Sequence, residues 1–109
     1  MEEKVLGKID FAEYGTFADR PFLMGLQLGF KMQFGGVGCG GRYTVNMSEE
    51  CKWDSQEERE HTITLYADKL YELLNQANVN YVSQLKNIPV EITLENNTFK
   101  SFRILTEVL

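Results

Sequence analysis

The sequence predicts an α+β domain: an antiparallel β-sheet of N-terminal strands and a C-terminal hairpin, with one long and one short helix. Apolar residues alternate with polar ones near both ends of the chain, whereas they recur at helical spacing in the middle. Strands at both ends with helices between them are typical of one helical layer packed on an antiparallel sheet. The chain has 109 residues, so we expect a single domain over 1–109.

The N-terminal half contains three expected strands. The first covers 4–14, and a connection with Gly, Asp and Pro follows over 14–21. The second covers 22–34 and is the clearest, because its large apolar residues share one parity: Met24, Leu26, Leu28, Phe30, Met32 and Phe34. A glycine-rich stretch at 35–41 then leads to a third strand at 42–47, which predicts a β-hairpin with a mobile glycine loop.

A long helix is expected over 56–77. Ser55 and Glu58 have the spacing of a capping box, and the apolar residues that follow recur at helical spacing. That stripe consists of Ile63, Ala67, Leu70, Leu73, Leu74 and Ala77. Asn78-Val79-Asn80 ends the helix, and 81–85 forms one short helical turn. Strands at 89–95 and 99–108 form a second hairpin, the last of them covered on both faces.

Charge and composition exclude several functions. There are 11 Lys and Arg against 16 Asp and Glu, so the net charge is −5, which excludes sequence-independent binding to a nucleic acid duplex. No stretch approaches the ~20 apolar residues of a membrane-spanning helix, and the acidic N-terminus does not resemble a signal peptide. Cys39 and Cys51 are too few for a disulfide framework, so we expect two free thiols in a reducing cytoplasm.

No catalytic, cofactor or metal site is predicted. His61 is the only histidine and is expected on the surface of the long helix, too isolated to form a metal site with the two cysteines. Cys39 is expected to be accessible, but no cation lies beside it to lower its pKa. Gly36, Gly38 and Gly41 match the dinucleotide-binding fingerprint in spacing, yet the next element reads as a strand rather than the required helix.

The arginines are more informative because they are few. Arg103 lies within an expected strand between two apolar residues, where a charge requires a partner. That partner is either a structural carboxylate, Glu91 or Glu107, or a ligand phosphate or purine face. Arg20 lies in a connection flanked by aromatic residues, and Arg42 borders the glycine stretch, where it is able to contact an anion or simply flank a turn.

Three further residues are candidates for contacts with a nucleotide. Tyr71 on the long helix offers a ring for stacking, although completing a core or a dimer face is the simpler role. Asn78 and Asn80 carry amides suited to a base edge or a ribose hydroxyl, although they also serve to end the helix.

The C-terminal half resembles small phage-encoded accessory proteins, in NYVSQLKNIPVEIT at 80–93 and FKSFRILTEV at 99–108. Among these, the order of elements resembles the Thoeris anti-defence sponge family. The resemblance implies a protein without catalytic activity that sequesters a small cyclic nucleotide signal, either glycocyclic ADP-ribose or a cyclic dinucleotide. It also implies a homodimer or a higher homo-oligomer in the cytoplasm of the infected bacterial host.

The same resemblance assigns ligand contacts to this chain. Arg103 matches the family's late-strand arginine and Arg20 its early-loop arginine, while Tyr71 matches its stacking aromatic. Asn78 or Asn80 corresponds to its amide after the long helix. The alternative is an anti-CRISPR-like phage protein that inhibits a bacterial defence protein by binding it directly.

Overall fold

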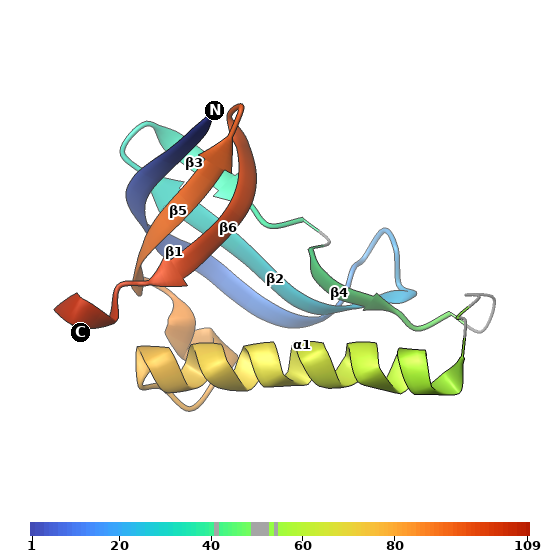
Figure 1. The fold of residues 1–109 in the computed structure, drawn as a ribbon. Coiled ribbons are helices and arrows are strands. Elements are labelled where there is room, and N and C mark those ends of the chain that lie inside the picture. Colours follow the sequence, from blue (N-terminus) through green and yellow to red (C-terminus); the bar gives the residue numbers. More distant parts are fainter. Residues whose placement is uncertain (41, 49–52, 54) are drawn as a thin grey trace.

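The computed structural model describes residues 1–40, 42–48, 53 and 55–109, which form a strongly curved antiparallel sheet with a long helix beneath it (Figure 1). The predicted α+β class is confirmed. The strands are β1 (Glu2–Thr16), β2 (Leu23–Met32), β3 (Gly35–Gly38), β4 (Tyr43–Asn46), β5 (Pro89–Glu95) and β6 (Thr98–Ile104). The helix α1 spans Gln56–Ala77, and the two 3-10 turns are η1 (Val82–Leu85) and η2 (Thr106–Val108).

Strand β1 organises the sheet because it has two different neighbours. Residues 2–8 pair with β5, and residues 7–16 pair with β2. The order across the sheet is β3-β2-β1-β5-β6, and β4 also pairs with β2, next to β3 along the same edge.

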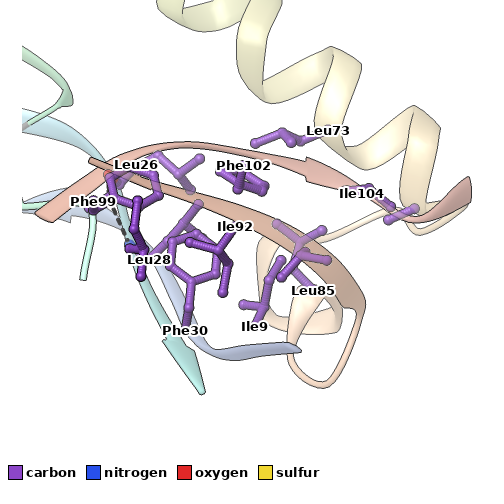
Figure 2. Close-up of a cluster of buried hydrophobic side chains, with 14 residues drawn as sticks. Ile9, Leu26, Leu28, Phe30, Leu73, Leu85, Ile92, Phe99, Phe102 and Ile104 are labelled. Atoms are coloured by element: carbon purple, nitrogen blue, oxygen red, sulfur yellow. Dashed lines mark hydrogen bonds between the residues drawn. The ribbon is translucent and has the colours of Figure 1, made fainter. Parts of the chain in front are cut away.

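The sheet curls until its edges approach one another. Phe30 of β2 stacks on Phe99 of β6 with ring centroids 5.3 Å apart, although β1 and β5 separate these strands in the sheet. Figure 2 shows the side chains that fill the enclosed space, with Leu73 reaching in from α1 and Leu85 from η1. The strands contribute most of this core, among them Ile9, Leu28, Phe30, Ile92, Phe102 and Ile104.

The bounds of α1 agree with the prediction, and its caps explain why. The backbone N–H of Glu58 donates to the Ser55 hydroxyl over 3.0 Å, and Asn78 ends the helix in the left-handed region with φ 57°. The expected apolar stripe packs only in part, since Leu73 and Ala77 are buried whereas Ala67 is exposed. The curled sheet fills its own interior, so the helix meets the core mainly through its C-terminal turns.

The prediction of a loop over 35–41 is wrong for the first four residues. Gly35–Gly38 form β3, with Gly35 opposite Met32 and Gly38 opposite Gly29, so the chain turns at Gln33 and Phe34. Gly35 has φ 145°, a conformation open to glycine alone. Residue 41 lies outside the described residues. Alternation could not reveal β3, because three of its four residues have no side chain.

Two other strand predictions need correction. Phe34, expected on the buried parity, is 92% exposed at the β2–β3 turn. The last strand ends at Ile104 rather than 108, and η2 follows it. This strand alternates between exposed and buried side chains, so one of its faces lies in the core and the other in solvent, not both faces in the core.

Candidate functional site

A cleft of about 640 Å³ lies where α1 passes the ends of β4 and β6. These two strands belong to opposite edges of the curled sheet, and the helix spans the distance between them (Figure 1). The lining residues are cationic, aromatic or neutral: Arg42, Tyr43, Thr62, Leu65, Tyr66, Lys69 and Lys100.

Helical spacing explains the α1 side of this cleft. Thr62, Tyr66 and Lys69 are separated by four and three residues, so they lie on one face of the helix. Tyr66 also links the helix to the residue before β4, because its hydroxyl donates to the backbone oxygen of Arg42 over 3.3 Å.

The ammonium group of Lys69 lies above two aromatic rings. Its Nζ is 5.8 Å from the ring centroid of Tyr43 and 5.6 Å from that of Phe102. The two rings meet edge to face at 6.2 Å, which fixes their orientation. Cation–π attraction holds the ammonium without neutralising its charge.

Arg42 is placed by the backbone of β6. Its Nη2 donates to the carbonyl oxygen of Phe99 over 3.2 Å, and its guanidinium lies 5.6 Å from the Phe99 ring centroid. Within the described part of the chain, neither Arg42 nor Lys69 forms an ion pair. Both cations therefore have donors available for an anion.

Lys100 differs from these two cations because carboxylates already hold it. It pairs with Glu2 and, at 3.5 Å, with Glu95. The hydrogen bond that Lys100 donates to Glu2 raises the pKa of Lys100, and the same contact lowers the pKa of Glu2.

Tyr43 supplies the cleft with a neutral phenol. Burial raises its pKa to about 12, and the nearby guanidinium of Arg42 offsets only part of that effect. Near neutral pH the hydroxyl therefore keeps its proton and is able to donate a hydrogen bond.

A second hollow of about 270 Å³ adjoins the cleft and shares Arg42 and Lys100 with it. Its other lining residues are Glu95, Asn96, Thr98 and Phe99. Arg42 and Lys100 border both hollows, so a bound ligand that extends from one hollow into the other would lie next to these two cations.

Arg103 lies on the solvent-facing side of β6, not in the cleft. Its Nε donates to Glu91 and its two terminal nitrogens donate to Glu107, each over 3.1 Å. These hydrogen bonds raise the pKa of Arg103, Glu107 contributing most, and lower the pKa of Glu107. Of the two kinds of partner considered from the sequence, the structural carboxylates are thus present, and a phosphate would compete with both of them.

The other four predicted contact residues are spread over the molecule. Arg20 lies in the β1–β2 turn, 3.6 Å from Asp19 and 4.9 Å from the ring centroid of Phe17. Tyr71 is 72% exposed on α1. Asn78 caps α1, and the backbone N–H of Asn80 donates to Gln84 over 2.9 Å. Neither these four nor Arg103 line either hollow.

The sequence did not single out Lys69 and Lys100. No pattern in the sequence distinguishes Lys69 from the other charges of the long helix, and only the fold shows that two rings lie beneath it. The available signal was the run Thr62, Tyr66 and Lys69 on one helix face, opposite the strand that begins after Arg42.

Cys39 is buried, which corrects the expectation that it is accessible. The backbone N–H of Leu28 donates to its sulfur over 3.3 Å, and the thiol itself points toward the carbonyls of Leu26 and Gly40. Burial raises the pKa of this thiol, which disfavours the nucleophilic thiolate. Cys39 is free, whereas Cys51 lies outside the described residues.

His61 is exposed on α1, as expected. Among the residues described, no three His, Cys, Asp or Glu side chains gather as metal ligands would. No helix in that same part of the chain is long and apolar enough to cross a membrane. No family model, curated protein or solved structure matches the chain.

Proposed function

We propose that the protein binds a small cyclic nucleotide in the cleft between α1, β4 and β6 and sequesters it without chemistry. One observation carries this proposal: in a chain of net charge −5, two cations without an ion pair in the described part of the chain line one cleft. Lys69 lies over the ring of Tyr43, and Arg42 lies over the ring of Phe99, which borders the adjoining hollow. This is the role of a Thoeris anti-defence sponge, acting as a homodimer or higher homo-oligomer in the cytoplasm of the infected bacterial host.

The chemistry of the lining supports a ligand that is both anionic and planar. Arg42 presents a donor fork suited to phosphate, and Lys69 a compact charge beside it. The rings of Tyr43 and Tyr66 offer surfaces on which a base is able to stack, worth about 1–3 kcal/mol per base. About 640 Å³ is within the size range of small-molecule sites.

The same lining supports binding rather than catalysis. Among the described residues that border the larger hollow, the groups able to act as a nucleophile or general base are lysine amines and Thr and Tyr hydroxyls. No carboxylate, imidazole or thiol stands among those lining residues to activate them. A phosphate bound between Arg42 and Lys69 meets no carboxylate among the described lining residues, whereas beside Lys100 it would lie near Glu2 and Glu95.

Calorimetric titration tests the proposal with glycocyclic ADP-ribose and a panel of cyclic dinucleotides. We expect heat with at least one of them, and a loss of about tenfold to a hundredfold in affinity for Lys69→Met, since one charge-assisted bond contributes about 1.5–3 kcal/mol. Lys31→Met, on the exposed side of β2, is the matched control and should bind normally. No heat with any ligand would reject the proposal.

Sequestration without chemistry makes a separate prediction. The nucleotide should be recovered intact when the complex is denatured by heat after long incubation, and chromatography against the untreated nucleotide measures this. A cleaved or altered nucleotide would identify an enzyme instead.

The alternative function is direct inhibition of a bacterial defence protein. The observation that favours it is Phe34, which is 92% exposed at the β2–β3 turn, where an aromatic side chain is available to a protein partner. A defence assay separates the two functions: Phe34→Ala should abolish inhibition by protein binding, whereas Lys69→Met should abolish inhibition by a sponge.

A further inference from the structure

The C-terminal half of β1 has a neighbour on one side only. Residues 2–8 pair with β5, and residues 7 and 8 have β2 on their other side as well. From residue 11 to residue 16 the only strand paired with β1 is β2, among the residues that the structure describes. The change occurs at a bulge around Asp10, after Ile9 has bonded to the segment that precedes β5 through Ile88 and Asn87.

The hydrogen bonds of β2 show which β1 groups point outward. Leu28 uses its N–H and its carbonyl for Cys39, on the side of β2 away from β1. Ala12 lies opposite Leu28, so this is a non-hydrogen-bonded pair, and the N–H and C=O of Ala12 point away from β2. By alternation, those of Tyr14 also point outward, whereas the carbonyl of Thr16 accepts a hydrogen bond from the side-chain Nε2 of Gln27 over 3.4 Å.

This open edge is accessible. Tyr14 is 45% exposed, and Glu13 and Thr16 are exposed too. A Cβ built on Gly15 would meet nothing within 4 Å. Unpaired, outward-pointing backbone groups of this kind are a template for another strand.

We propose that this edge pairs antiparallel with the same edge of a second copy of the chain, which joins two sheets across a two-fold axis. An antiparallel edge of this kind is self-complementary, as a two-fold interface requires. The proposal does not depend on the nucleotide, because Tyr14 and its neighbours do not line the cleft.

Charge selects the register. The free backbone groups of Ala12 and Tyr14 allow two registers that use Tyr14, which lies opposite either Ala12 or Tyr14 of the second copy. The first places Glu13 directly opposite Glu13 of the second copy, which repels. The second places Glu13 opposite Gly15 and pairs the two Tyr14 rings at the axis, so we assign the second.

Light scattering over a wide range of protein concentration tests the association. We expect a mass twice the 12.6 kDa of the chain, and a twofold drop to the monomer mass for Tyr14→Lys, which places two ammonium groups at the axis. Tyr71→Lys, also at an exposed tyrosine, should remain dimeric. A monomer at every concentration for the unaltered chain would overturn the proposal.

Disulfide trapping tests the register and does not rely on the lysine variant folding. In a chain with Cys51→Ser, Tyr14→Cys should form a cross-linked dimer under mild oxidation, because paired strands bring Cα atoms within disulfide reach. Tyr71→Cys is the control and should stay monomeric on a non-reducing gel. Equal cross-linking of both variants, or none at Tyr14→Cys, would contradict pairing at this edge.

Discussion

Tyr43 shows how one residue links the core to the cleft. Its ring packs edge to face against Phe102 and lies under the Lys69 ammonium, and the residue also lines the cleft. Burial makes the phenolate unfavourable, so the pKa rises to about 12.

This pKa predicts a pH dependence. Because the folded-state pKa lies above the unfolded value of about 10, the contribution of Tyr43 to stability is complete below that value and is lost as the pH rises toward about 12. An absorbance titration of phenolate, with the trace of Tyr43→Phe subtracted, should show a midpoint near about 12. A midpoint at the unfolded value would contradict this burial.

Arg42 and Arg103 show what sequence can and cannot reveal about a site. Both were recognisable as unusual cations, but the sequence could not show that Arg103 faces two carboxylates whereas Arg42 faces a carbonyl and a ring. The contacts of Arg42 depend on the approach of β6 to the residue before β4, a distant segment that no local pattern encodes. Glu91 and Glu107 lie across the hairpin and four residues along from Arg103, so the sequence named them as candidates but could not decide between them and a ligand.

At the scale of the element, the sequence predicts an element best where it carries capping residues or a regular alternation of apolar and polar side chains. Ser55 and Asn78 fixed the bounds of α1, and the alternation in β2 revealed its core face. The sequence missed β3, which has almost no side chains, and the end of β6, because apolar residues continue past Ile104 into η2.

Substitutions at the glycines of β2 test how closely neighbouring residues approach the backbone of this strand. A Cβ on Gly25 would lie 2.1 Å from the backbone oxygen of Tyr43, whereas on Gly29 the nearest atoms would be those of the Phe11 ring. That ring is half-exposed and is able to swing aside, but the backbone of β4 is not.

We therefore expect Gly25→Ala to lower the free energy of unfolding by about 1–3 kcal/mol, and Gly29→Ala by less. Gly15→Ala, where a Cβ meets nothing, should be neutral or stabilise by about 0.4–1 kcal/mol. Urea denaturation measures all three. Equal losses at Gly25 and Gly29 would show that β4 approaches β2 less closely than described.

At the scale of the molecule, the helix bridges two edges of the sheet that do not pair with one another in the described part of the chain. β4 and β6 lie at opposite edges, and α1 contacts both strands; its buried side chains are Leu73 and Ala77. The cleft therefore exists only while the C-terminal turns of α1 remain seated on the core.

Leu73→Ala tests this dependence. Removing a side chain that is 2% exposed should cost about 2–5 kcal/mol of stability, because the strands around it cannot collapse fully into the space. Nucleotide affinity should fall with it, although Leu73 does not line the cleft. Leu65→Ala, at an exposed position on the same helix, should cost little stability. Unchanged affinity in Leu73→Ala would show that the cleft does not depend on the packing of α1 against the core.

The central claim is that a nucleotide binds between α1, β4 and β6, and an NMR titration with the tightest-binding cyclic nucleotide tests it most directly. We expect the largest shift changes at Arg42, Tyr43, Tyr66 and Lys69, with Arg20 and Arg103 unmoved. Shift changes centred on Arg103, Arg20 and Tyr71 instead, with the cleft residues silent, would contradict the claim.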